Sequence, residues 1–232
     1  KQQVVVTLEH MEADYSLRRL LWDRHLTIGR LQAAGLTVDA SRLSRTKADA
    51  LAVGAPAVAP GLLAQIALPL DLTLDDVHLE GRAQLPGNPG QPSLAAEYVV
   101  TGGKFRAGQE GQLRLKATVH NPEVGAKVHT LRTQAMLRAT LTAQRTFRQV
   151  SLEALVDAEG KALSGESQLK VDAELFRTSV GENYALSVST QLLGTREAVL
   201  NLQARLPAGG HQYGGDWDLK ASAAQLEPFF LG

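Results

Sequence analysis

Apolar and polar residues alternate repeatedly along most of this 232-residue chain. The run at 68–75 reads Leu-Pro-Leu-Asp-Leu-Thr-Leu-Asp, and similar runs occupy 113–119 and 169–175. A period of two is the repeat of a β-strand with one wet face and one dry face. The alternation therefore predicts a protein made mainly of strands, whose dry faces must be covered by something.

Turn residues divide the alternating region into separate strands. Proline, glycine and asparagine cluster at 86–90, 121–123 and 207–210, and the links between the strands are short. Short links join neighbouring strands in opposite directions, so we expect an antiparallel meander. The expected strands lie near 67–84, 93–102, 110–120, 127–142, 146–157, 166–177, 183–193, 197–206 and 214–223.

These strands are longer than usual. Several run to ~10–14 residues, roughly 33–46 Å at about 3.3 Å per residue, whereas a typical strand has about five or six residues. In the first of them the alternation changes phase, because Leu72 and Leu74 are followed by Val77. The adjacent pair Asp75-Asp76 predicts a β-bulge at that point.

The chain before the strand array has a different pattern. Residues 1–40 predict a strand, a short helix at 15–24 with Asp14 as its N-cap, and a further strand pair. The helix places Leu17, Leu20 and Leu21 on one side, and we expect that side to cover one end of the sheet. The alternative is a helix lying on a membrane surface.

Residues 41–66 form a predicted loop containing Gly54, Pro56, Pro60 and Gly61. A connection this long is uncommon inside a compact domain, so it is either a flap or a crossing segment. With the strand array at 67–232, the three parts are expected to form a single β-rich domain over 1–232.

Composition excludes several classes of function. Lys+Arg and Asp+Glu both number 24, which leaves no basic excess to bind nucleic acid. Cysteine is absent, so there are no disulfides, thiolate metal sites or cysteine nucleophiles. No window of 18 apolar residues occurs. The chain begins at Lys1 without an initiator methionine, so we expect that an upstream membrane anchor could have been removed.

No catalytic or metal-binding motif stands out from the strand pattern. The histidines show no metal-ligand spacing, and the carboxylates fit the polar half of the strands. Gly102-Gly103 and Gly209-Gly210 lack the following helix of a phosphate-binding loop, and no Gly-x-Ser-x-Gly elbow occurs. We therefore expect no enzymatic activity, no cofactor and no metal.

Long antiparallel strands with one apolar face can close as a barrel, stack as a sandwich or curl into a trough. The dry face predicted at 131–141 mixes large and small residues, which suits a lined groove and tight sheet packing equally. Aromatic residues make up only 5% of the chain, which disfavours the aromatic girdles of an outer-membrane barrel.

Three segments resemble proteins of the AsmA and TamB superfamily. The first is 6–21, Val-Thr-Leu-Glu-His-Met-Glu-Ala-Asp-Tyr-Ser-Leu-Arg-Arg-Leu-Leu, followed by the strand pair at 26–31 and 35–39. The second is 68–81, Leu-Pro-Leu-Asp-Leu-Thr-Leu-Asp-Asp-Val-His-Leu-Glu-Gly, and the third is 215–221, Gly-Asp-Trp-Asp-Leu-Lys-Ala. The resemblance covers the first 40 residues best and the strand array by its style.

The resemblance implies a periplasmic protein anchored in the inner membrane of a Gram-negative-type bacterium. Such proteins are thought to act as bridges that let phospholipids cross the periplasm, and their sheets curl into elongated apolar grooves. We accordingly expect the chain to be mainly β, with the meander curled into a taco-like groove or open barrel. The chain lacks an anchor and is short, so the resemblance implies an N-terminal segment of such a bridge.

On this interpretation the dry faces hold the acyl chains of a phospholipid, and burial of apolar surface drives binding at about 25 cal/mol per Å². The residues expected to line the groove are Leu70, Leu72, Leu74, Leu113, Leu115, Val119, Leu137, Leu141, Leu152, Val156, Leu169, Val171, Leu175, Leu186, Val188, Leu200, Leu202, Trp217 and Leu219.

Two alternatives remain. One is a structural or interaction module of the cell envelope, with a solid core and partners bound through its edge strands. The other is a hydrolase or sugar-binding jelly roll, which would need clustered carboxylates and aromatic platforms. The low aromatic content disfavours it.

Overall fold

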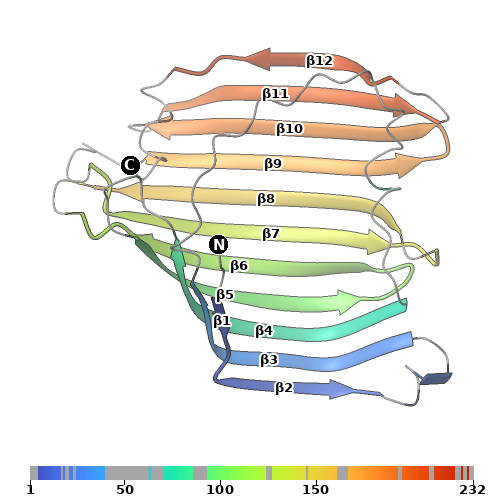
Figure 1. The fold of residues 1–232 in the computed structure, drawn as a ribbon. Helices are drawn as coiled ribbons and strands as arrows, with labels where there is room; N and C mark the ends of the chain where they lie inside the picture. The colour runs from blue at the N-terminus through green and yellow to red at the C-terminus, as the bar shows by residue number, and fades with distance from the viewer. Residues whose placement is uncertain are drawn as a thin grey trace.

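The alternating segments form strands throughout the chain, as the computed structural model in Figure 1 shows. The structure describes residues 5–16, 18, 21–22, 25–39, 63, 71–85, 93–123, 127–144, 146–160, 167–192, 195–208, 212–222, 226 and 229. The strands are β1 (Val5–Thr7), β2 (His10–Tyr15), β3 (His25–Asp39), β4 (Asp71–Leu85), β5 (Leu94–Phe105), β6 (Glu110–His120), β7 (Thr130–Leu141), β8 (Phe147–Glu159), β9 (Ser167–Thr178), β10 (Gly181–Leu192), β11 (Thr195–Pro207) and β12 (Gly214–Leu219).

These strands pair into one 12-stranded sheet. From β4 to β12 each strand lies beside the next one in sequence, and every one of these neighbouring pairs is antiparallel. The antiparallel meander and the strands expected from 67 onward are therefore confirmed. The strands are also long, since β3 and β4 each have 15 residues, roughly 50 Å at about 3.3 Å per residue.

One pair breaks the meander, because β3 and β4 run parallel. Parallel neighbours need a connection that returns the chain from one end of the sheet to the other. The chain between Asp39 and Asp71 joins opposite ends of the sheet, and we call it the crossing segment. The loop predicted at 41–66, with its two alternatives, lies outside the described residues except for Leu63. The sequence pattern alone did not show the parallel pairing, because alternation is the same in parallel and antiparallel strands.

The sheet is open, which corrects the prediction of a taco-like groove or open barrel. It is neither closed nor strongly curled, and β2 and β12 lie at opposite edges (Figure 1). If the two edges joined in the register that continues the cross-strand rows, Glu12 would face Asp218 and Asp14 would face Asp216. Like charges set opposite each other destabilise a strand pair.

The predicted helix at 15–24 lies largely outside the described residues, and within them the chain forms no complete helix. Tyr15 ends strand β2, which pairs with β3 along its whole length. The prediction of Asp14 as the helix N-cap is therefore wrong, because Asp14 lies within β2 and pairs with Arg30. Leu21 is 69% exposed, so the expectation that its side chain packs on the sheet is wrong.

The predicted change of phase in β4 is present. Leu74 packs in a cluster with Phe105 and Leu113, while Val77 pairs with Gly102, which in turn pairs with Leu113. Leu74 and Val77 therefore share one face although they are separated by an odd number of positions. The slip keeps the apolar residues of β4 on a single face of the sheet.

Candidate functional site

Side chains that face each other on neighbouring strands line up in rows across a sheet. Tracing the register from β2 to β12 gives one row made entirely of apolar residues. This first row consists of Met11, Ala33, Leu79, Val100, Leu115, Ala135, Ala154, Val171, Val188, Leu200 and Leu219.

A second row lies two residues along each strand and is also free of polar side chains. It consists of Ala13, Leu31, Val77, Gly102, Leu113, Leu137, Leu152, Ala173, Leu186, Leu202 and Trp217. We call the two rows together the apolar band. At about 4.8 Å between strands the band is roughly 48 Å long. It runs across the strands rather than along them.

The apolar band is only half-buried. From β6 to β11 each of its side chains has an intermediate exposure, and on β12 Trp217 and Leu219 are 70% and 55% exposed. Nearer the other edge, Ala33 and Val77 of the band are buried. Further buried residues occur on either side of the band. One buried cluster contains Phe105, Ala139 and Leu141, and the other contains Val128, Leu131 and Ala158. The band is thus an apolar strip that crosses the strands between these two buried clusters.

The predicted groove residues divide into three groups. Those that the structure brings together in the band are Leu113, Leu115, Leu137, Leu152, Val171, Leu186, Val188, Leu200, Leu202, Trp217 and Leu219. Those on the same face beside the band are Leu74, Val119, Leu141, Val156, Leu169 and Leu175. Leu70 and the side chain of Leu72 lie outside the described part of the chain.

Sequence reasoning missed the small members of the band. Ala135 and Ala154 pair with each other, with Leu115 and Val171 as their outer neighbours. Ala173 lies between Leu152 and Leu186. The signal for all three was the same alternation that marked the larger residues, and it was available in the sequence. Leu79 and Val100 belong to the same row and were also missed.

Two segments from outside the strands contact this face. Leu63, from the crossing segment, is 1% exposed and its backbone N–H donates to the Glu182 carboxylate on β10 (3.2 Å). Phe229, which follows β12 in the chain, packs against the cluster of Val128, Leu131 and Ala158. The answer to what covers the apolar face is therefore in part the chain itself.

Glu182 is the one charged residue found buried on this face among the described residues, at 4% exposure. Its carboxylate also accepts a hydrogen bond from the Tyr184 hydroxyl (2.6 Å). The Tyr184 ring meets Tyr213 edge to face, with ring centroids 5.5 Å apart. These contacts fix one end of β10 to the crossing segment.

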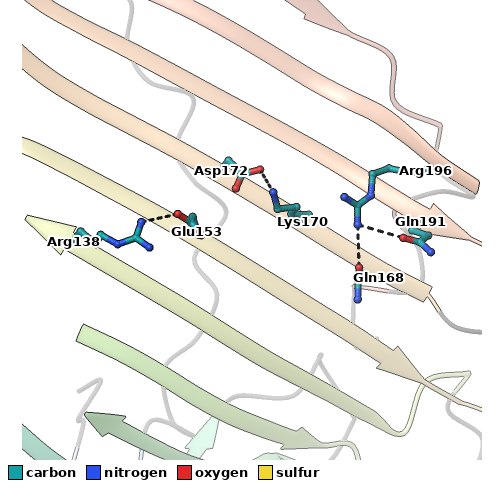
Figure 2. A network of polar contacts seen from close by, with 7 residues as sticks. All are labelled: Arg138, Glu153, Gln168, Lys170, Asp172, Gln191 and Arg196. Atoms are coloured by element: carbon teal, nitrogen blue, oxygen red, sulfur yellow. Dashed lines mark hydrogen bonds and ion pairs between the residues drawn. The ribbon is translucent and has the colours of Figure 1, made fainter. Parts of the chain in front are cut away.

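The opposite face of the sheet is polar and carries ion pairs both between strands and along a strand. Figure 2 shows Arg138 donating to Glu153 (2.7 Å) and Lys170 beside Asp172 (2.9 Å). Most of these side chains are about one-third to one-half exposed. Surface pairs of this kind contribute little to stability, typically about 0–1 kcal/mol. The charged side chains keep the polar face hydrated, as on any protein surface. The partly exposed apolar face is the one that needs an explanation.

A hollow of about 740 Å³ lies on the polar face over β4 to β7. Its walls carry both signs of charge, and Arg82 is paired with Glu97 across it (3.3 Å). Arg132, a further cation of the wall, forms an ion pair with Glu159. Because two of its cations, Arg82 and Arg132, are already paired with carboxylates, this hollow is a weaker candidate than the apolar band.

The described residues hold no cluster of three or more histidines and carboxylates that could bind a metal ion. Within the same residues there is no helix of the length and apolarity that crossing a bilayer requires. No protein family, curated protein or solved structure matches this chain.

Proposed function

We propose that this chain is a non-enzymatic lipid-binding module whose apolar band holds the acyl chains of a phospholipid. The proposal rests on one observation, the partial exposure of the apolar band from β6 to β11. Its leucines and valines form an unbroken apolar strip, and they remain half-buried while clusters on either side of them are sealed. A soluble protein rarely leaves so continuous an apolar surface open without a ligand or partner.

The physical basis is the transfer of hydrocarbon out of water. Each methylene group buried against the band contributes about 0.8 kcal/mol, so an acyl chain gains several kcal/mol along the strip. The headgroup needs only to stay in water beyond the sheet. Binding by this means depends on apolar area and shape, and it requires no catalytic group.

The segments that resemble AsmA and TamB proteins support the same proposal. On that basis the chain acts in the periplasm as part of a protein anchored in the inner membrane, and it helps phospholipid pass between membranes. The apolar band offers a track of this kind because it continues to both edges of the sheet.

Adjacent residues of one strand provide a sharp test. Leu137 lies in the apolar band, and Met136 points to the opposite face, where it lines a hollow with Glu153 and Lys170. A photoreactive amino acid placed at either position would be irradiated with phosphatidylethanolamine vesicles. We expect a protein–lipid adduct from position 137 and none from 136. Equal labelling at both positions, or none, would show that the band does not hold lipid.

A second function is favoured by the contacts of Leu63 and Phe229 with the apolar face. If such segments seal the whole face, the protein is a structural or interaction module with a filled core. In that case phospholipid would not bind, and the fluorescence of an environment-sensitive apolar dye would not increase when the folded protein is added.

A further inference from the structure

Among the described strands, β12 has a neighbour on one side only. It pairs with β11 and is the last strand in the order (Figure 1). All six of its residues are exposed. Phe229, which follows β12 in the chain, packs away from this edge on the cluster of Val128 and Leu131. An edge strand of this kind presents backbone N–H and C=O groups that can pair with another strand.

The two faces of this edge differ in chemistry. Trp217 and Leu219 continue the apolar band, and Asp216 and Asp218 lie on the polar face. Lys220, just beyond the strand, pairs with Asp218 at 3.0 Å. A strand that docks here must therefore place apolar side chains on one face and meet carboxylates on the other.

Charge disfavours a second copy of this chain as that strand. If two copies of β12 pair antiparallel about Trp217, Asp216 of each copy faces Asp218 of the other. If β2 of another copy pairs with β12 in the register that continues the cross-strand rows, the same aspartates face Glu12 and Asp14. Like charges directly opposite destabilise both arrangements.

We propose that β12 is a docking edge for an extended segment of another protein whose alternate residues are apolar and basic. The apolar residues of that segment extend the band beyond Trp217 and Leu219. Its lysine or arginine side chains pair with Asp216 and Asp218. The acidic residues thus select the partner and at the same time disfavour self-association.

Peptide binding to the whole protein tests this. In a Trp22→Phe background, Trp217 is the remaining tryptophan and reports on the edge by its fluorescence. A blocked peptide of alternating valine and lysine is expected to bind at least about tenfold more tightly than one of alternating valine and glutamate. Equal binding of the two peptides, or binding of neither, would overturn the proposal.

Reversing the charges of β12 provides a second test of the proposal. The double variant Asp216→Lys/Asp218→Lys should prefer the glutamate peptide, whereas Asp172→Lys/Glu174→Lys, on the polar face of the central strand β9, should keep the wild-type preference. The reversed variant should also form a one-to-one complex with the wild-type protein, while each alone sediments as a monomer. An unchanged preference after reversal at β12 would contradict the assignment of the edge.

Discussion

The backbone N–H of Leu63 donates a hydrogen bond to the carboxylate of Glu182, 119 positions later in the chain. Both residues are nearly inaccessible, at 1% and 4% exposure. Leu63 precedes β4 in sequence and Glu182 belongs to β10, so the bond joins the crossing segment to the far part of the sheet. The Tyr184 hydroxyl donates to the same carboxylate oxygen.

Replacing Glu182 by alanine should leave one buried donor, the Leu63 N–H, without its acceptor, and it also removes the hydrogen bond from the half-buried Tyr184 hydroxyl. An unsatisfied buried polar group costs about 1–3 kcal/mol, so the free energy of unfolding should fall by at least that amount. Glu182→Gln keeps an acceptor oxygen and should lose less. Urea unfolding of the three proteins measures the difference, and an alanine variant as stable as the wild type would show that the bond does not hold the segment.

Gly103 is expected to tolerate substitution much less than Gly108. Both have positive φ, 135° and 78° respectively. A Cβ at Gly103 would overlap the Asp75 carbonyl, whereas nothing lies within 4 Å of a Cβ at Gly108. Gly108→Ala should cost about 1 kcal/mol from backbone strain alone, and Gly103→Ala about 3 kcal/mol or more. Equal losses in thermal or urea unfolding would mean that the close approach of β4 and β5 is absent.

Tyr98 should make stability depend on pH in the alkaline range. Burial raises the pKa of its hydroxyl above the ordinary value of 10.0, and that hydroxyl donates to the Leu36 carbonyl (3.4 Å). The unfolded chain therefore releases this proton first, so stability is full below pH 10 and falls as pH rises through the folded pKa. Urea unfolding between pH 8 and 11.5 should show the fall.

The Tyr98→Phe variant should lose part of that dependence on pH. Tyr15→Phe, which changes a tyrosine that is 58% exposed on edge strand β2, serves as the matched control and should leave the dependence as it is. If the two variants and the wild type all lose stability in parallel, Tyr98 is not responsible for the fall.

Much of the sheet follows from the sequence because alternation is a local signal. The runs around Leu113 and Leu169 specify a strand and its inward face without reference to any partner. The change of phase at Asp75-Asp76 was equally visible, since two adjacent polar residues cannot both belong to a period of two. The β-bulge predicted there is wrong in its form, because the pairing of β4 with β3 and with β5 keeps one register past these residues. What alternation does not encode is direction, which is why the parallel pairing of β3 with β4 was missed.

Curvature and long-range contacts were also beyond the sequence pattern. Whether a meander closes depends on its edges, and the matching of Glu12 with Asp218 becomes apparent only when the register across the whole sheet is known. The bond between Leu63 and Glu182 has no local signal, because a glutamate in an alternating strand resembles any other surface residue. The same holds for the band, whose rows run perpendicular to the chain.

The central claim is that lipid occupies the apolar band, and native mass spectrometry tests it most directly. Protein purified from bacteria without detergent should carry adducts with the mass of phospholipid. Leu137→Asp and Val171→Asp, both in the band, should abolish the adducts, while Lys170→Glu on the polar face should retain them, provided that circular dichroism shows all three folded. Wild-type protein free of lipid, or adducts that Lys170→Glu loses as readily as Leu137→Asp, would contradict the claim.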